Sequence, residues 1–311
     1  MTRLIRLNGV QTKPTVAFLG PLGTYSHQAS YEQFHDTVEF IEKGKIADVF
    51  DALGETDFGV IPQENTIFGP VVETYDALRG VESGFIRGEI ALKVQHCLIV
   101  RKGVKISDID CVMSHEQALG QCRGFLAKYL PGAATMKMTS TAAAAEVVAN
   151  TSGSTRAAIC SKICLKMFQG LELLEEGIQD EKSNYTRFYV MAKNRKTTLP
   201  VVPVTPVSHA LVRIHFGCPE NNPGDITAAV KALELGVARI DRRPALNRTP
   251  FDDVYFVELR DSQARYANTN GVDAGGDIGR MNGKTPWHER VEEAIERVRV
   301  LGGEVKLLGL W

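Results

Sequence analysis

Short apolar runs alternate with segments of helical periodicity over residues 15–193. The apolar runs are TVAFL, FGVI, IDCVM, ATMKM and AAIC, and each precedes a segment such as YSHQASYEQF or TAAAAEVVAN. Apolar runs of about 4–8 residues are typical of buried strands, whereas apolar positions three to four residues apart are typical of helices. The alternation predicts an α/β domain with a largely parallel sheet, whose ligand sites lie at the carboxyl ends of the strands.

Two segments of this domain, residues 97–110 and 171–184, fit a chain that passes between two lobes. Residues 1–14 precede the first apolar run and are predicted to form an N-terminal tail. Residues 194–207 contain three prolines and no hydrophobic period, which predicts a linker to a second domain over residues 208–311.

The second domain has a different order of elements. Its apolar patterns predict strands over 209–216, 237–243, 253–260 and 304–311 and helices over 223–235 and 286–301. This β-α-β-β-α-β order is the ferredoxin-like arrangement. Residues 261–283 are rich in Gly, Asn and Asp and predict a mobile loop.

The overall composition narrows the class of protein. The 311 residues are 44% hydrophobic and 23% charged, with a formal net charge of −1. A chain with so little net charge has no global field to recruit nucleic acid or an anionic membrane, and no apolar run approaches the roughly 20 residues of a membrane helix. We therefore expect neither a nucleic acid nor a membrane as a partner.

Six cysteines are scattered along the chain without a C-x-x-C pair. Cys160 and Cys164 are four residues apart, but no second pair or histidine lies close in sequence. Isolated cysteines in apolar stretches are typical of buried free thiols. We expect free thiols, no metal site and a cytoplasmic location.

Four stretches of the first domain bring polar groups to strand ends or helix starts. The first is LGPLGTYSHQA, in which Gly20 and Gly23 permit a tight turn and Thr24 or Ser26 can cap the following helix. Backbone amides of such a turn bind anions, although neither a P-loop nor a G-x-G-x-x-G spacing is present. An anion site and an ordinary helix cap both remain open.

The second stretch, IPQENTIFGP, places Gln63, Glu64, Asn65 and Thr66 in succession after an apolar strand. A polar loop explains this succession, and so does a group of donors and acceptors that face a cleft.

The third stretch is MSHEQALGQC. Ser114 and Gln117 have the spacing of a capping box, which explains both without a ligand. Gln121 lies on the same predicted helical face and is not explained in that way. His115, in the first turn, fits either a solvated surface residue or a base.

The fourth stretch is NYTRF, which enters a long apolar run. Thr186 fits a β-favouring residue at a strand entry and Arg187 fits a surface ion pair, but both also fit contacts with a ligand. Periodicity does not separate these alternatives.

Taken together, these stretches resemble the prephenate dehydratase family, in order and over roughly residues 15–311. The matching motifs are VAFLGPLGTYSHQAS, GVIPQENTIFGPVVETYDAL, SHEQALGQC, STAAAAEVVA with AAICSK, and NYTRF. The resemblance implies a two-lobed, periplasmic-binding-protein-like (type II) catalytic domain, with the active site between the lobes. It also implies decarboxylating dehydration of prephenate to phenylpyruvate for L-phenylalanine biosynthesis. Aromatisation drives that reaction, so the resemblance implies no cofactor and no metal.

The resemblance assigns a role to individual residues. Thr186 is implied to assist departure of the substrate hydroxyl, by a hydrogen bond or a relay rather than full proton transfer. Glu64 and Asn65 are implied to share in catalysis, and Arg187 either pairs with a substrate carboxylate or braces its strand. The remaining residues implied for substrate binding are Thr24, Ser26, Thr66, Ser114, Gln121 and Phe188.

In the second domain the resemblance is to an amino-acid-binding ACT regulatory domain, which implies L-phenylalanine as effector and a homodimer or homotetramer. Two of its motifs depart from the family pattern, Gly224-Asp225-Ile226-Thr227 and Asp241-Arg242-Arg243-Pro244. Feedback inhibition through Gly224, Asp225, Ile226, Asp241, Arg242 and Pro244 is the hypothesis. Asp225 adds a charge where the family has an apolar residue, which leaves the ligand open.

Two other functions remain as alternatives. Arogenate dehydratase uses the same chemistry on the transaminated substrate, and the motifs do not separate it from prephenate dehydratase. A non-catalytic amino-acid sensor is the alternative of another class, against which the intact NYTRF counts. No chorismate mutase segment is expected before residue 15.

Overall fold

The computed structural model describes residues 13–153, 155–200, 207–217, 225–246, 250–261 and 285–311. Three predictions fall mostly outside these residues: the tail over 1–14, the loop over 261–283 and the role of Gly224. None of the helices in the described ranges is long and apolar enough to cross a membrane.

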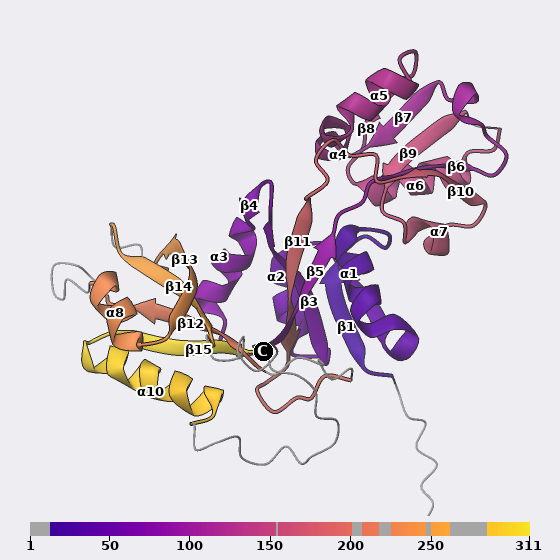
Figure 1. Ribbon diagram of the computed structural model, residues 1–311. Coiled ribbons are helices and arrows are strands. Elements are labelled where there is room, and N and C mark those ends of the chain that lie inside the picture. Colours follow the sequence, from indigo (N-terminus) through magenta and orange to yellow (C-terminus); the bar gives the residue numbers. More distant parts are fainter. Residues whose placement is uncertain (1–12, 154, 201–206, 218–224, 247–249, 262–284) are drawn as a thin grey trace, which may run out of the picture.

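The first lobe contains one part of a ten-stranded sheet and the helices that cover it (Figure 1). Its elements are β1 (Thr15–Leu19), α1 (Tyr25–Phe34), η1 (His35–Thr37), β2 (Glu39–Lys43), α2 (Ile46–Ala52), β3 (Phe58–Asn65), β4 (Gly69–Pro70), α3 (Val72–Gly80), β5 (Phe85–Lys93) and β11 (Tyr185–Ala192). The strand order is β5-β11-β3-β1-β2, and β4 pairs with β3. β1 is parallel to β2 and β3, but β11 is antiparallel to β3 and β5. The sheet is therefore mixed rather than largely parallel, because β11 enters it on the way back from the other lobe.

The second lobe has its own five-stranded sheet, set apart from the first in Figure 1. Its elements are β6 (Cys97–Arg101), η2 (Ile106–Asp108), β7 (Cys111–Ser114), α4 (Glu116–Gln121), α5 (Arg123–Tyr129), β8 (Ala134–Lys137), α6 (Thr141–Asn150), β9 (Arg156–Cys160), α7 (Cys164–Met167) and β10 (Leu171–Glu176). The strand order is β10-β6-β9-β7-β8, in which β7 is parallel to β8 and β9. Two sheets joined by chain crossovers give the domain the two lobes that the sequence predicts.

Two crossover segments join the lobes, residues 94–96 and 177–184. The second falls within the predicted segment 171–184, whose first six residues form the strand β10 instead. The first precedes the predicted segment 97–110, which was wrong because residues 97–101 form the buried strand β6. The crossovers bond to each other: Val94 N donates to Asn184 O at 2.9 Å, and Gly177 N donates to His96 O at 2.9 Å. They therefore form one connected hinge region.

The C-terminal unit follows the predicted β-α-β-β-α-β succession. Its elements are β12 (His209–His215), α8 (Ile226–Leu233), β13 (Gly236–Pro244), β14 (Asp253–Arg260), α10 (Trp287–Val300) and β15 (Glu304–Leu310). The strand order is β13-β14-β12-β15, and β12 is antiparallel to both of its neighbours. Apolar residues of α8 and α10 pack against those of the sheet in one core cluster.

This unit continues the sheet of the first lobe. β15 pairs with β5 at a single position, where Gly309 faces Ile86. A Cβ atom on residue 309 would lie 2.4 Å from the Ile86 Cβ, so the backbones approach this closely only because residue 309 is glycine. Tyr75 and Tyr189 of the first lobe share a buried cluster with Phe256 of β14. The first lobe and the C-terminal unit thus share both a sheet and an apolar core.

Candidate active site

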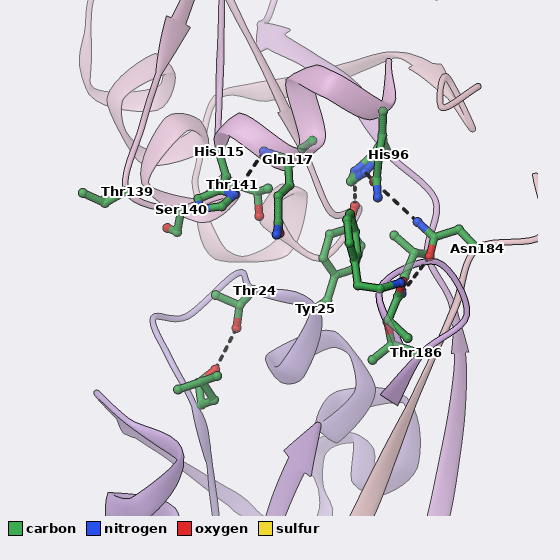
Figure 2. A pocket seen from close by; sticks show the side chains of 16 residues that line it. Thr24, Tyr25, His96, His115, Gln117, Thr139, Ser140, Thr141, Asn184 and Thr186 are labelled. Atoms are coloured by element: carbon green, nitrogen blue, oxygen red, sulfur yellow. Dashed lines mark hydrogen bonds between the residues drawn. The ribbon is translucent and has the colours of Figure 1, made fainter. Parts of the chain in front are cut away.

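A cavity of about 400 Å³ lies between the two lobes (Figure 2). Residues of the first lobe, of the second lobe and of both crossovers contribute to its wall. The lining residues are Leu19, Thr24, Tyr25, Asn65, Phe68, Val94, His96, His115, Gln117, Ala118, Gln121, Thr139, Ser140, Thr141, Asn184 and Thr186. None of these described residues is a Lys, Arg, Asp or Glu, so hydroxyl, amide and imidazole groups form the polar part of the wall.

Three helices begin at this cavity. Thr24 caps α1 and accepts a hydrogen bond from His27 N at 3.3 Å, and Ser140 caps α6 and accepts from Ala143 N at 3.0 Å. His115 caps α4 through its Nδ1, which lies 3.3 Å from Gln117 N. Unpaired amides and the helix dipole give a helix start a partial positive charge. Three such starts suit the cavity for an anion without a cationic side chain.

Thr186 meets Asn65 across paired strands. The two residues are partners in the register of β11 and β3, and Asn65 Nδ2 donates to Thr186 Oγ1 at 2.9 Å. Asn65 Oδ1 accepts from the backbone N–H groups of Ile67 and Phe68 at 2.9 and 3.2 Å. Because a backbone N–H only donates, these bonds fix which end of the Asn65 amide faces Thr186. Thr186 Oγ1 therefore acts as an acceptor toward Asn65, and its own proton is available to another group.

Glu64 and Arg187, the sequence neighbours of these two residues, do not line the cavity. They are partners in the same register, and successive side chains of a strand point to opposite faces. Arg187 Nε lies 2.6 Å from Glu64 Oε1, and its terminal nitrogens lie 3.3 Å from Glu89 and 3.3 Å from Glu258 of the C-terminal unit. The structure thus brings the predicted residues Glu64 and Arg187 together in an ionic cluster between domains.

Arg239 of β13 extends this ionic cluster. Its guanidinium contacts Glu64, and its Nε lies 2.6 Å from Asp241. Burial raises the pKa of Glu89, although Arg187 opposes the rise. The cluster therefore connects the strand pair that carries Asn65 and Thr186 to two strands of the C-terminal unit.

Four other predicted site residues lie behind the cavity wall or beside it. Ser114 is fully buried, and its Oγ contacts Ile159 O. It ends β7, and His115 is the N-cap of α4, so the capping box predicted at Ser114 and Gln117 was wrong. Ser26 and Phe188 are buried, Phe188 in an apolar cluster.

Thr66 is exposed and closes the turn after β3. Its Oγ1 donates to Ser183 O at 2.9 Å and accepts from Tyr185 N at 2.9 Å. Among the predicted site residues, the cavity wall therefore contains Thr24, Asn65, Gln121 and Thr186.

Sequence reasoning missed Tyr25, His96 and Asn184 as site residues. Tyr25 Oη lies 2.6 Å from His96 Nδ1, and His96 Nε2 lies 2.6 Å from Gln121 Oε1. Figure 2 shows His96, Asn184 and Thr186 along one side of the cavity, opposite His115 and Ser140. The sequence offered only one sign of His96, a single histidine between two apolar strands. Such a histidine also fits a buried residue whose hydrogen bonds are made within the core.

Burial acts on both rings of this pair. Burial lowers the pKa of His96, although the hydrogen bond to Gln121 opposes this shift. Burial raises the pKa of Tyr25 well above its usual value. His96 is 3% exposed. Both groups are therefore neutral near neutral pH.

The residues predicted for regulation lie in the C-terminal unit. Asp225 is the N-cap of α8, where it accepts from Thr227 N at 2.7 Å, and Ile226 is the first residue of that helix. Arg242 pairs with Asp253 at 3.1 Å, and Pro244 O accepts from Arg79 of α3 at 2.6 Å.

The described residues contain no group of three or more His, Cys, Asp or Glu side chains arranged to hold a metal ion. The five described cysteines, Cys97, Cys111, Cys122, Cys160 and Cys164, are free thiols. Cys218 lies outside the described residues.

A two-lobed α/β domain with a polar cleft that is suited to anions defines a class of small-molecule-binding proteins and enzymes. Within this class, the sequence matches the family model described as prephenate dehydratase over residues 16–196. This match covers more than half of the chain, and the chain belongs to the prephenate dehydratase family.

Curated relatives agree with this assignment, and a solved structure has a similar fold. The prephenate dehydratase of Methanocaldococcus jannaschii is 34% identical over 257 residues, which cover 80% of this chain and 89% of that protein. The bifunctional chorismate mutase/prephenate dehydratase of Escherichia coli strain K12 is 32% identical over 253 residues, 79% of this chain. This chain matches 63% of the length of that relative. The fold is similar to that of the prephenate dehydratase from Arthrobacter aurescens in complex with L-Phe, with a TM-score of 0.73 and 24% identity over 95% of this chain and 89% of that one.

Proposed function

We propose that the chain is a prephenate dehydratase, a hydro-lyase that converts prephenate to phenylpyruvate, water and CO2. The observation that carries the proposal is the hydrogen bond from Asn65 Nδ2 to Thr186 Oγ1, at 2.9 Å in the wall of an anion-suited cleft. Because Thr186 accepts this bond, its own O–H is free to donate to an oxygen atom of a ligand in the cleft. In this proposal, that ligand oxygen is the leaving hydroxyl of prephenate.

The proposed reaction breaks two bonds of the substrate ring. The carbon–carbon bond to the ring carboxylate breaks, and its electron pair moves into the ring as the carbon–oxygen bond to the hydroxyl breaks. The departing hydroxide takes up one proton from solvent and leaves as water. Thr186 stabilises the developing charge on that oxygen with a hydrogen bond. A donor placed at a charge that develops in the transition state lowers the activation barrier.

The other groups of the cleft have binding roles in this proposal. Gln121, together with the helix starts at Thr24, His115 and Ser140, holds the two substrate carboxylates. Leu19, Phe68, Val94 and Ala118 give the wall an apolar part that tolerates the conversion of a carboxylate to neutral CO2. Asn65 orients Thr186 and makes no substrate contact.

The remaining predicted residues support the site in this proposal. Ser26, Thr66, Ser114 and Phe188 support the strands and turns that position the cavity wall. Glu64 and Arg187 link it to the C-terminal unit rather than contact the substrate.

The experiment that tests the reaction is phenylpyruvate formation by the purified protein with prephenate as substrate. Prephenate also decays without enzyme, so the rate is compared with a buffer blank. Turnover above the blank supports the proposal. No turnover on prephenate, with turnover on arogenate, would establish arogenate dehydratase instead. The absence of both would favour a non-catalytic amino-acid sensor.

The C-terminal unit is proposed to be an ACT regulatory domain that binds L-phenylalanine. Its support is the strand order β13-β14-β12-β15 with α8 and α10 packed on the sheet. In this proposal Asp225 serves as helix cap, and Ile226, Asp241, Arg242 and Pro244 surround the ligand. Calorimetry with L-phenylalanine tests it, and no heat of binding would contradict it.

Assembly and location complete the proposal. We propose a homodimer or homotetramer formed through the C-terminal units, which light scattering of the purified protein tests. The free state of the described cysteines supports a reducing compartment such as the cytoplasm.

A further inference from the structure

A chain of hydrogen bonds runs through the cleft, and its direction is set at one end. Asn65 Oδ1 accepts from the backbone N–H groups of Ile67 and Phe68, so Asn65 Nδ2 is the donor toward its other neighbours. The two hydrogens of Asn65 Nδ2 meet Asn184 Oδ1 at 2.8 Å and Thr186 Oγ1 at 2.9 Å, both nearer than a third acceptor, Tyr185 O, at 3.1 Å. Since Asn184 accepts through its oxygen, its Nδ2 must face the next residue of the chain.

The next residue is Gln121, on the other lobe. Asn184 Nδ2 donates to Gln121 Oε1 at 3.4 Å, a long bond that favours an acceptor at this position. His96 Nε2 lies 2.6 Å from the same oxygen. A carbonyl oxygen only accepts, so His96 Nε2 must carry the hydrogen.

The last link is Tyr25. His96 is neutral, because burial lowers its pKa, so a proton on Nε2 leaves Nδ1 bare. Nδ1 can then accept from Tyr25 Oη, which lies 2.6 Å away and thus nearer than Gln95 O, the other acceptor for that hydroxyl, at 3.3 Å. The backbone amides of Ile67 and Phe68 thus lead to one consistent set of donors and acceptors, from Asn65 through Asn184, Gln121 and His96 to Tyr25.

This arrangement leaves the Nε2 group of the Gln121 amide available to a ligand. Its oxygen meets His96 and Asn184, whereas its Nε2 has no hydrogen-bond partner among the described residues, and the side chain lines the cleft. Without His96, the amide can rotate and present its oxygen to an anion, which is repulsive. We infer that His96 is a positioning residue, whose Nε2–H holds Gln121 so that both hydrogens of the Gln121 amide face a carboxylate of the substrate.

The inference rests on the proposed function for its substrate, and one test is independent of that function. Nitrogen NMR of the unliganded wild-type protein reports the protonation of each imidazole nitrogen, with assignment from the spectrum of His96→Gln. We expect His96 to be protonated at Nε2 and bare at Nδ1 at neutral pH. An Nδ1–H tautomer or an imidazolium would overturn the inference, whatever the activity of the protein.

Kinetics separate positioning from a purely structural role. His96→Phe should raise KM for prephenate by about tenfold, the value of one hydrogen bond to a charged group, with a smaller change in kcat. His96→Gln keeps an N–H donor near the position of Nε2 and should restore most of the lost affinity. Equal defects in His96→Phe and His96→Gln would overturn the inference, as would an unchanged KM in His96→Phe.

A double-mutant cycle tests whether His96 acts through Gln121. Gln121→Leu removes the amide that His96 holds, so adding His96→Phe should not raise KM further. Additive effects of the two substitutions would overturn the inference. Thermal unfolding of each variant checks that it is folded, and the NMR measurement on the wild-type protein decides the question if a variant is not. A wild-type protein without turnover on prephenate would contradict the proposed function and leave the tautomer measurement as the deciding test.

Discussion

The guanidinium of Arg187 lies 3.3 Å from the carboxylate of Glu258, on the face of β11 that is opposite the cavity-lining Thr186. Glu258 belongs to β14 of the C-terminal unit and is only 2% exposed. One residue of the pair Thr186-Arg187 therefore faces the candidate active site, while the next residue neutralises a buried charge of the other domain.

The first prediction concerns the stability of this contact. Arg187→Leu should lower the free energy of unfolding by about 3–5 kcal/mol, because it leaves the Glu258 carboxylate buried without its cation. Urea denaturation measures the change. The matched control is Arg195→Ala, which removes an ion pair with Glu292 whose side chains are 48% and 46% exposed. The control substitution should lower the free energy of unfolding by no more than about 1 kcal/mol. Equal losses of unfolding free energy in the two variants would contradict the account.

The second prediction is a loss of stability in mild acid. Burial lowers the pKa of His27 to about 4, and its Nδ1 accepts from Gly23 N at 3.1 Å. In the unfolded chain the pKa is about 6.5, so between about pH 6.5 and pH 4 the unfolded state binds a proton that the folded state does not. Stability should therefore fall as pH drops through this window.

The variant that isolates His27 is His27→Asn, which keeps an acceptor near Nδ1 but cannot titrate. Urea midpoints at several pH values should fall less steeply in this variant than in the wild-type protein. Part of the fall should remain, since the lowered pKa of His96 acts in the same direction. Identical slopes in the two proteins would show that His27 does not contribute.

The third prediction concerns a substitution that reverses the hydrogen bond between Asn65 and Thr186. Asn65→Asp keeps the acceptor for Ile67 N and Phe68 N but replaces the amide donor with an oxygen. Thr186 O–H would then donate to Asp at 65 instead of to the substrate, and kcat should fall by about 100-fold. The measurement is steady-state turnover of prephenate, with thermal unfolding to check the fold.

A control is needed because Asn65→Asp also adds a negative charge to the cleft. Gln117→Glu adds the same charge to the cavity wall without a side-chain contact to Thr186. It should raise KM through repulsion of the anionic substrate and affect kcat much less. A comparable fall of kcat in both variants would attribute the effect to charge and not to the orientation of Thr186.

The sequence predicted the succession of elements in the C-terminal unit because each strand and helix has a local period. The prediction of a largely parallel sheet in the first domain was wrong, because β11 is antiparallel to both of its neighbours and no local period records that pairing. The sequence placed the first crossover too late, because CLIV looks the same whether it crosses between lobes or lies in the middle of a sheet. It assigned Ser114 to a helix cap for a similar reason: Ser114-His115 offers two adjacent capping residues, and the end of β7 at Ser114 decides between them.

The candidate site was predictable in part. Thr24, Asn65, Gln121 and Thr186 line the cavity, as the motifs suggested. Glu64 and Arg187 were grouped with them because they are neighbours in sequence, yet neighbours on a strand point to opposite faces. His96 and Tyr25 are 71 positions apart, and only the fold brings their side chains to 2.6 Å.

The measurement that tests the central claim most directly is phenylpyruvate formation from prephenate by the wild-type protein, Thr186→Val and Thr186→Ser. Valine matches the shape of threonine without the hydroxyl, whereas serine keeps the hydroxyl. We expect Thr186→Val to fold normally and to lose about 2–4 kcal/mol of transition-state stabilisation, and Thr186→Ser to retain most of the turnover. Near-normal turnover by a folded Thr186→Val protein would contradict the account, because the hydroxyl that Asn65 orients would then have no part in the reaction.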